Sequence, residues 1–526
     1  MEKIDWFAFI MDGKAGIYPK KPKKRRKIAK SVSGSRQLSG TRRPQNDLFS
    51  KKRQKKLLFD RKTVGLFLDK STYKCYNNHN NAVLCDPAKF LSKFCIGGAF
   101  MGVDQERKLN ISFSPPDLTE KEVEEVSAAL RSGWITTGPR VKKFEREVAE
   151  WVGVGLTEKG TPRCVCLNSQ TACQEMALHI MGIGSVAGGS YDDEVIVPAY
   201  TYTASASVVC HVGAKLVLVD IQKDNPVIDY DALEAAITER TKAVIPVDLG
   251  GVPCDYDRIF AILEKKKSLF RPANARQEAL GRVAVLADTA HAFGATYHGT
   301  RIGSIADFSS FSWHAVKNLT TGEGGSLCWR AHKGFDDEAI YRELQLLSLH
   351  GQSKDALHKG QPGMWEYDIV APYYKCNMTD VLAALGLSQF ERYPEMLAHR
   401  KKIIAQYDAA FHPLGIQTLE HYSDSYTSSG HLYLSRVFRK NGLPIGDAER
   451  REIIIKMAEA GIACNVHYKP LPLHTAYKNL GFHEKDYPNA VDYYLNEITL
   501  PLHTRLSEED VNYIIEQYTK IVKEYL

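Results

Sequence analysis

Short apolar runs alternate with stretches of helical periodicity from about residue 119 onward. Buried strands are predicted at 163–167, 194–198, 215–219, 242–247 and 283–287. Helices are predicted between several of them, at 171–182, 200–212, 230–239 and 256–266. Alternation of this kind is typical of a mostly parallel sheet that carries helices on both faces. Ligands in such sheets bind at the carboxyl ends of the strands, so the residues that follow each run are candidate site residues.

Helix signals also stand before and after this alternating region. Thr119 and Glu122 form a capping box ahead of a helix that Gly133 ends, and a second helix is predicted at 140–152. A long helix is predicted at 379–412. Beyond it, strand-like sequence mixes with helices, and the helices are predicted at 447–460 and 508–525. The C-terminal part therefore reads as a smaller α/β domain that follows a larger one.

The charge divides the chain unevenly. Residues 1–100 hold 24 Lys and Arg against 7 Asp and Glu, a balance of +17, whereas the remainder holds 45 against 55, a balance of −10. Basic runs at 20–30 and 51–56 are compatible with a disordered tail, with nucleic-acid binding or with an import signal. A start of translation at Met101 is a further alternative. We expect a basic extension over 1–105, largely disordered or spurious, a large domain over 106–378, and the long helix with the small domain over 379–526.

Composition argues against several other classes of protein. No run of 18 or more apolar residues exists, so no transmembrane helix is predicted, and the apolar segment at 6–11 lacks the basic flank of a signal peptide. The eleven cysteines include no CxxC pair, which favours scattered buried thiols over a disulfide framework or a metal site. We expect a cytoplasmic protein without a structural metal.

Polar residues follow the first two predicted strands. The run "NSQTACQEMAL" (168–178) leads small polar residues into a helix, where free backbone N–H groups suit a phosphate. Ser169 and Thr171 would equally serve as simple helix caps. In "PAYTYTASAS" (198–207), Tyr200 or Tyr202 would stack on a flat ring or belong to the core.

Two further strand ends carry charged groups. Asp288 follows the run at 283–287, where a buried carboxylate needs a cationic partner or hydrogen bonds. The protonated ring nitrogen of a cofactor would be such a partner. Alternatively, Asp288 would cap the helix that follows it. Lys317 lies in "SSFSWHAVKNLTTGEGG" (309–325), between apolar sequence and a glycine loop. A lysine in a pocket has a lowered pKa, and its neutral amine attacks aldehydes. A phosphate site, a stacking aromatic, a carboxylate and an amine together indicate pyridoxal 5′-phosphate.

These residues lie in motifs that resemble the DegT/DnrJ/EryC1/StrS sugar aminotransferases, which have the aspartate-aminotransferase fold. The resemblance runs from about Ser112 to the C-terminus. The motifs that carry it are "LRSGWITTGPRVKKFE" (130–145), "LNSQTA" (167–172), "VPAYTYTASA" (197–206), "ADTAHAFGATYHGTRIGSIADFSSFSWHAVKNLTTGEGG" (287–325), "YYKCNMTDVLAALGLSQ" (373–389) and "PLPLH" (470–474). The first hundred residues have no counterpart in the family.

The resemblance implies roles for the candidate residues. Lys317 matches the lysine that forms a Schiff base with pyridoxal 5′-phosphate and then carries protons during the reaction. Asp288 matches the carboxylate that keeps the ring nitrogen protonated. His291 stands where the family has Gln or His beside the 3-oxygen of the cofactor, and Tyr202 matches the stacking aromatic.

The resemblance also implies a phosphate site and a shared interface. Gln170, Thr171 and Ser312 match the phosphate-binding positions, although the family often has Gly or Ala at Gln170, so backbone N–H groups would bind the phosphate there. Asn377 matches a residue that reaches the phosphate from the other subunit, which implies a homodimer with shared sites. His467, in "NVHYKPLPLH" (465–474), is a candidate contact to the sugar.

The function that follows is transamination. Glutamate would donate an amino group, and a nucleotide-linked keto-sugar would accept it at C4 or C3, in the synthesis of a surface polysaccharide or glycan precursor. A sugar dehydratase of the same fold is the nearest alternative, but those relatives carry histidine at the position of Lys317. A nucleic-acid-binding protein that works through its basic N-terminal part is an alternative of another class, which the acidic remainder does not favour.

Overall fold

The computed structural model describes residues 74–76, 82–84, 110–353 and 366–526. The chain separates into two compact units, Met1–Val103 and Asp104–Leu526. In the first unit, β1 (Lys74–Tyr76) and β2 (Ala82–Leu84) form an antiparallel ladder. The basic runs at 20–30 and 51–56 lie outside the described residues, so the expected disorder of this extension stays a prediction. The division into two domains near residue 378 stays a prediction as well.

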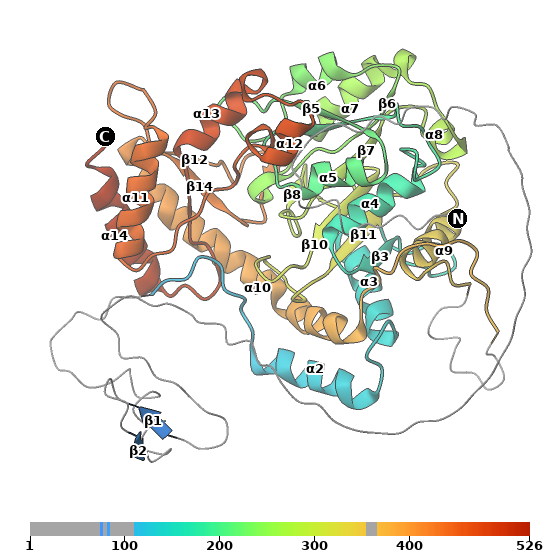
Figure 1. The fold of residues 1–526 in the computed structure, drawn as a ribbon, viewed down its shortest axis with the longest axis horizontal. Helices are drawn as coiled ribbons and strands as arrows, with labels where there is room; N and C mark the ends of the chain where they lie inside the picture. Colours follow the sequence, from blue (N-terminus) through green and yellow to red (C-terminus); the bar gives the residue numbers. More distant parts are fainter. Residues whose placement is uncertain (1–73, 77–81, 85–109, 354–365) are drawn as a thin grey trace, which may run out of the picture. The chain divides into compact units, whose positions relative to one another are not determined.

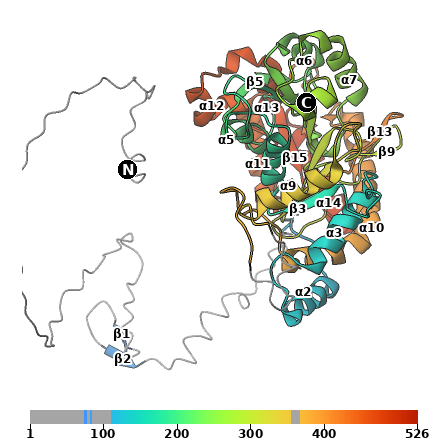
Figure 2. The ribbon, with the colours of Figure 1, turned by 90° about the vertical axis from the view of Figure 1, so that its right-hand side faces the viewer.

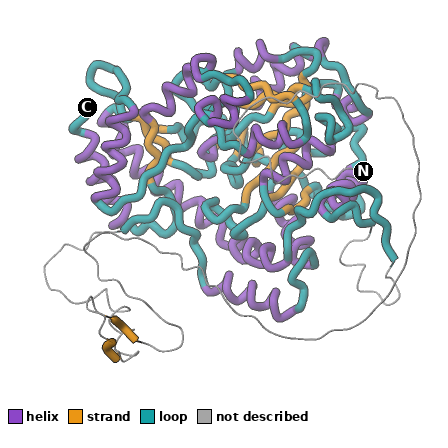
Figure 3. The backbone as a smooth tube through the Cα atoms, viewed as in Figure 1, coloured by secondary structure: helices purple, strands orange, loops and turns teal. Residues whose placement is uncertain are grey.

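A seven-stranded mixed sheet forms the centre of the second unit, as the orange strands of Figure 3 show. Its strands are β3 (Cys164–Leu167), β4 (Glu194–Pro198), β5 (Lys215–Val219), β6 (Thr241–Val244), β7 (Ala284–Asp288), β10 (Phe308–Ser312) and β11 (Gly325–Trp329). The spatial order is β3-β11-β10-β7-β6-β4-β5. Only β11 runs antiparallel to its neighbours in this sheet. The predicted mostly parallel sheet is thereby confirmed.

The strand boundaries differ from the predicted ones in two informative places. β6 ends at Val244 rather than at residue 247, because Pro246 has no N–H to donate to a ladder. β7 includes Asp288 as its last residue, so the carboxylate is fixed by the sheet rather than by a flexible loop. β10 and β11 were not among the predicted strands, since their serines and glycines interrupt the apolar pattern.

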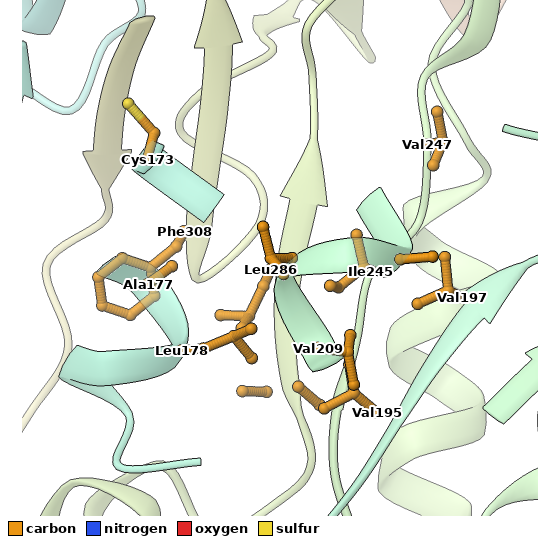
Figure 4. Close-up of a cluster of buried hydrophobic side chains, with 14 of the residues drawn as sticks. Cys173, Ala177, Leu178, Val195, Val197, Val209, Ile245, Val247, Leu286 and Phe308 are labelled. Atoms are coloured by element: carbon orange, nitrogen blue, oxygen red, sulfur yellow. The ribbon is translucent and has the colours of Figure 1, made fainter. Parts of the chain in front are cut away.

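Apolar side chains cover both faces of the sheet. Along β4, Val195 and Val197 point into one core, whereas Ile196 points into the other. Figure 4 shows part of the first core, with Leu286 of β7 and Phe308 of β10 beside Leu178. Strands that are buried on both faces are continuous apolar runs, which is why the sequence predicted them.

The two cores are closed by separate sets of helices. One set comprises α4 (Gln170–Ile180), α5 (Ala204–His211) and α9 (Asp337–Ser348). The other comprises α3 (Pro139–Trp151), α6 (Tyr230–Ala236), α7 (Tyr256–Lys265) and the first half of α10 (Asp380–Phe411). Figure 2 shows α5 on the opposite side from α3 and α7. The predicted helices at 140–152, 171–182, 230–239 and 256–266 are confirmed within a few residues.

Helix α10 joins the large sheet to the C-terminal layer, as Figure 1 shows. Its first half contributes Ala383 and Leu387 to the core under the sheet. Its second half contributes Ile403, Tyr407 and Phe411 to a third core. That core also contains residues of β14 (Tyr433–Arg436), β15 (Glu497–Leu500), α11 (Asp447–Glu459) and α14 (Glu508–Val522). The smaller α/β layer expected after 379–412 is therefore present.

The remaining elements surround these layers. α2 (Glu120–Ser132) begins with the predicted capping box, in which the N–H of Thr119 donates to Glu122, and it ends at Gly133. Short elements complete the described part, and they are α8 (Ala275–Leu280), α12 (Thr475–Asn479), α13 (Pro488–Asn496), β8 (Thr296–Tyr297), β9 (Thr300–Arg301), β12 (Gln417–Thr418) and β13 (Tyr426–Thr427). Within the described ranges, no helix combines the length and the apolar character that crossing a membrane requires.

Candidate active site

A cavity of about 330 Å³ lies where β4, β6, β7 and β10 end. Its walls come from residues at or after these strand ends, from the loop between β10 and β11, from the start of α4 (169–171) and from Tyr468. Of the predicted site residues, those on its walls are Gln170, Thr171, Tyr202, Asp288, His291, Ser312 and Lys317. The volume lies within the range of roughly 300–1,000 Å³ that is usual for small-ligand sites. Side chains separated by more than a hundred residues thus meet at the strand ends, as the topology predicts.

Lys317 lies in the loop that connects β10 to β11. Its N–H donates to the carbonyl of His314 at 2.8 Å, and Trp313 N donates to Gly324 O at 2.9 Å, which closes the base of the loop. Burial lowers the pKa of the Lys317 ammonium to about 8, against the opposing effect of the Asp288 carboxylate. About one tenth of the Lys317 side chains are therefore neutral amines at pH 7, far more than for a lysine with the ordinary pKa of 10.5, and a nucleophilic lysine requires this neutral form.

The loop ends at Gly325, a position where only glycine fits. A Cβ atom at this position would lie 2.4 Å from the backbone nitrogen of Gln170 and 2.4 Å from the carbonyl carbon of Ser169. The first residue of β11 therefore packs directly against the backbone at the start of α4. Only a residue without a side chain permits this contact, which brings the Lys317 loop next to the first turn of that helix.

The carboxylate of Asp288 is buried at the centre of the cavity wall. Ser205 Oγ donates to its Oδ2 at 2.7 Å, and the N–H of Ala290 donates to its Oδ1 at 3.1 Å. Burial raises the pKa of Asp288, while the two hydrogen bonds and the Lys317 charge oppose that rise. A cation placed against this carboxylate would stabilise its ionised form. Asp288 thus has the environment that the predicted contact to a protonated ring nitrogen needs.

The hydrogen-bond geometry fixes the tautomer of His291. The N–H of Gly250 donates to His291 Nδ1 at 3.1 Å, so the proton of the neutral ring must be on Nε2. That nitrogen faces the hydroxyl of Tyr468 at 3.2 Å and therefore donates to it. Burial and the nearby Lys317 charge lower the pKa of His291 well below its ordinary value, so the ring is a neutral donor that faces the cavity.

The first turn of α4 forms the polar end of the cavity. Ser169 is the N-cap, and its Oγ accepts the N–H of Ala172 at 3.1 Å. The N–H groups of the first turn have no partner within the helix, and the positive end of its dipole attracts anions. The side chain of Gln170 donates to Ser310 Oγ at 2.9 Å in the core. This position therefore offers its backbone to a phosphate, while Thr171 and Ser312 lie on the cavity wall.

The structure separates the two tyrosines that the sequence left as alternatives. Tyr200 is fully buried, and its ring packs edge-on against Tyr493 at 5.3 Å. Tyr202 is 60 % exposed, lines the cavity, and lies 5.8 Å from the ring of Tyr468. Tyr202 is consequently the tyrosine available for stacking on a ring in the cavity.

Two predicted residues do not line the cavity. Asn377 Nδ2 donates to Thr137 Oγ1 at 2.6 Å, outside the cavity of its own chain. His467 stacks on Phe113 at 5.4 Å, and its Nδ1 lies 2.9 Å from Thr499 Oγ1. The contact of His467 with a sugar and the contact of Asn377 with a partner's phosphate both stay predictions.

Three residues with clear positions in the site were not singled out from the sequence. Tyr468 is the neighbour of His467, and it rather than His467 reaches the cavity. Ser205 holds Asp288, and it stands among the small residues after β4. Asp248 follows β6, and burial raises the pKa of its carboxyl to about 7 although Cys254 N and Tyr256 Oη donate to it. The strand-end rule points to Asp248 and Ser205, whereas nothing in the local sequence distinguishes Tyr468.

The chemical character of these walls fits pyridoxal 5′-phosphate. The carboxylate of Asp288 is buried and needs a cationic partner, so it would bind the protonated ring nitrogen. The unpaired N–H groups at the start of α4, with Thr171 and Ser312, would bind the phosphate. The amine of Lys317, with its pKa of about 8, would meet the aldehyde.

Comparisons with known proteins identify the family and the fold of the chain. The model of the DegT/DnrJ/EryC1/StrS aminotransferase family matches residues 116–519. The spore coat polysaccharide biosynthesis protein SpsC of Bacillus subtilis is 38% identical over 422 residues, which are 80% of this chain and 99% of that protein. Spr1654 of Streptococcus pneumoniae, assigned as a sugar aminotransferase and solved in its PMP form, is 53% identical with a TM-score of 0.74, over 79% of this chain and 100% of that one.

A more distant structure extends the comparison. Helicobacter pylori PseC, an aminotransferase involved in the biosynthesis of pseudoaminic acid, is 26% identical with a TM-score of 0.64, over 79% of this chain and 100% of that one. The predicted family and the predicted fold are confirmed by these matches. The chain therefore belongs to the DegT/DnrJ/EryC1/StrS aminotransferase family, whose cofactor is pyridoxal 5′-phosphate.

Proposed function

We propose that this aminotransferase moves an amino group from glutamate to C4 of a nucleotide-linked keto-sugar, in the synthesis of a surface polysaccharide or glycan precursor. The observation that carries the proposal is the pairing of Lys317 and Asp288 on the walls of one cavity. The names of SpsC and Spr1654 support the sugar as acceptor and polysaccharide synthesis as the context.

The residues divide the chemistry between them. Pyridoxal 5′-phosphate supplies an aldehyde that condenses with amines and a ring that accepts the electrons of a broken C–H bond. Lys317 would hold the cofactor through its amine, and the released amine would carry a proton between the reacting carbon of the substrate and the cofactor. A pKa of about 8 suits both roles, since the neutral and charged forms of Lys317 are both populated near neutral pH.

Asp288 and His291 set the electronic state of the site. The carboxylate of Asp288, held by Ser205 and Ala290, keeps a proton on the ring nitrogen. The Nε2–H of His291 donates to Tyr468 on the cavity wall, because the N–H of Gly250 donates to Nδ1. Both groups are fixed by backbone contacts, so the site needs little rearrangement during the reaction.

One cavity serves both half-reactions. Glutamate and the keto-sugar must each reach the amine of Lys317, and the walls provide a single place for doing so. The first product has to leave before the acceptor enters, which gives ping-pong kinetics. We also propose a homodimer in which Asn377 of each chain reaches the partner's phosphate site. The cytoplasm is the proposed location, which the eight unpaired cysteines of the described ranges favour.

The test measures the two half-reactions separately. Purified protein is mixed with glutamate alone, and the absorbance of the cofactor is followed. A panel of UDP-, dTDP- and GDP-linked keto-sugars then identifies the acceptor, and NMR of the product locates the new amino group. Asp288→Asn should retain the cofactor but lose about a hundredfold or more in kcat, because an amide does not hold a proton on the ring nitrogen. Failure of glutamate to change the cofactor in the wild type, or full activity of the variant, would contradict the proposal.

A further inference from the structure

Two further hollows extend from the Lys317 cavity along the segment 466–477. The cavity shares Thr201, Tyr202 and Tyr468 with a neighbouring hollow of about 350 Å³. That hollow shares Lys469 with a third hollow, of about 430 Å³, against α11 and α13. The three hollows are therefore neighbours along this segment, and each shares at least one wall residue with the next.

The third hollow has an unusual set of charges. The charged side chains that line it are Arg450, Arg451 and Lys469, and no carboxylate is among the lining residues. Asp447, just outside, accepts from Arg451 Nε at 2.7 Å and from Arg450 Nη2. One carboxylate between two guanidinium groups leaves one positive charge uncompensated. Lys469 is exposed, and its ammonium forms no hydrogen bond or ion pair within the described part of the chain, so it adds a second positive charge.

Arg450 provides a further sign of an incomplete site. Its side chain is only 2% exposed, and its guanidinium lies 4.4 Å from the centre of the Tyr494 ring. Its Nε is buried and has no hydrogen-bond partner among the described residues. A buried donor without an acceptor destabilises the protein unless a bound group supplies one. An anion in this hollow would lie against three cationic side chains.

The rest of the hollow is lined by aliphatic and aromatic side chains. Ile455 is 57% exposed on the outer face of α11, and Ile454, Val466 and the ring of Tyr494 continue the same wall. Cationic groups beside an exposed aliphatic and aromatic surface match a ligand with an anionic part joined to a planar apolar part. A nucleoside diphosphate has this combination, and each of its phosphates in a sugar linkage carries one negative charge. The two uncompensated positive charges are therefore matched.

We propose that this hollow binds the nucleotide end of the sugar substrate. The diphosphate lies against Lys469 and Arg451, and the nucleoside packs on Ile455 and Tyr494. The sugar extends past Tyr202 and Tyr468 into the Lys317 cavity. This inference rests on the proposed function, because it takes the acceptor to be a nucleotide-linked sugar. It assigns specificity for the nucleotide to the C-terminal layer, outside the walls that bind the cofactor.

The test is equilibrium binding of UDP, dTDP and GDP to the cofactor-loaded protein, measured by calorimetry without turnover. Arg451→Ala and Lys469→Ala should each weaken the tightest of the three about tenfold, which corresponds to about 1.4 kcal/mol per charge-assisted contact. The double variant should also show a smaller dependence of Kd on salt than the wild type. Lys440→Ala is the matched control, since Lys440 is an exposed lysine that lines none of the three hollows.

The outcomes separate this inference from the proposed function. Tenfold weakening in both variants, with an unchanged Kd in the Lys440 control, supports the nucleotide site. Unchanged binding in Arg451→Ala and Lys469→Ala overturns it, and so does a wild type that binds none of the three nucleotides at millimolar concentration. The glutamate half-reaction of the wild type is recorded in parallel. If glutamate converts the cofactor while nucleotide binding fails, the aminotransferase activity stands and only the nucleotide site is wrong.

Discussion

The hydroxyl of Ser205 offers a way to change the charge state of Asp288 without touching the cavity wall. Ser205 Oγ donates to Asp288 Oδ2 at 2.7 Å, and both residues are buried. A hydrogen bond to a charged group contributes about 1.5–3 kcal/mol. Since one pKa unit corresponds to about 1.4 kcal/mol, Ser205→Ala should raise the pKa of Asp288 by about 1–2 units. The remaining N–H of Ala290 keeps the carboxylate in place.

The sign of the effect follows from the direction of the existing shift. Burial already raises the pKa of Asp288 above its ordinary value of 3.8, so the folded protein binds this proton more tightly than the unfolded chain does. The stability that this proton contributes is fully present below pH 3.8, and it is lost as the pH rises through the folded pKa. Ser205→Ala raises the folded pKa of Asp288 further, so more of the stability is lost before the carboxylate is ionised. The cofactor-free variant should therefore be destabilised by about 1.5–3 kcal/mol at neutral pH.

Activity should move in the same direction. The glutamate half-reaction requires ionised Asp288, so the acid limb of its pH profile should shift upward by about 1–2 units while the plateau changes little. The control is Ser207→Ala, which lies on the same helix and whose Oγ donates only to the carbonyl of Ala204, at 3.5 Å. Stopped-flow absorbance between pH 5 and 9 measures the limb. An acid limb that stays in place in Ser205→Ala, or that moves equally in Ser207→Ala, would refute the reasoning.

Four further predictions follow from the same contacts. Borohydride reduction of the loaded protein should attach the cofactor to Lys317, as peptide mass spectrometry detects, and Lys317→Ala should lose turnover; attachment to another lysine would exclude this role. Mixing inactive Lys317→Ala with inactive Asn377→Asp should restore activity through mixed dimers, and no recovery despite subunit exchange would exclude shared sites. Removal of residues 1–100 should leave a soluble and active protein, because the second compact unit begins at Asp104 and the family match at residue 116; an insoluble product would contradict this. Gly325→Ala should lower the free energy of unfolding by about 1–3 kcal/mol, because its Cβ would lie 2.4 Å from backbone atoms. Gly446→Ala is the control: its Cβ would lie 3.8 Å from its nearest neighbour, and alanine at this N-cap of α11 should cost only about 0.5 kcal/mol. Equal effects of the two variants in denaturant titrations would count against the packing argument.

Much of the fold could be predicted because the strands of the large sheet are apolar on both faces. The runs at 163–167 and 194–198 differ from β3 and β4 by at most one residue. The local sequence did not predict the strands whose formation depends on their pairing partners. β10 (FSSFS) and β11 (GSLCW) interrupt their apolar residues with serine and glycine, and they are strands because each pairs along its full length with the other. No local pattern reveals that pairing, nor that β11 runs antiparallel.

Some residues of the site could likewise be predicted from the sequence, and others could not. Asp288 and Tyr202 follow strands, so the strand-end rule located them, and Lys317 was conspicuous as a lysine beside an apolar run. Gln170 was expected to bind the phosphate through its backbone N–H, and this contact stays a prediction; its side chain donates to Ser310 at the start of α4. Which atoms of a helix start face a ligand depends on the helical phase, and composition does not determine that phase.

The residues that hold the site together come from the most distant parts of the chain. Asp248 accepts the N–H of Cys254, which closes the turn containing Gly250. Gly250 has a φ of 69°, a conformation that favours glycine, and its N–H sets the tautomer of His291. His291 then donates to Tyr468, on the C-terminal side of the cavity. The C-terminal layer is therefore joined to the cavity by a hydrogen bond whose direction is fixed by the Gly250 N–H on the other nitrogen of the His291 ring. Because Tyr468 also lines the hollow that leads to Lys469, movement of that layer would change the His291 contact and the proposed nucleotide path together.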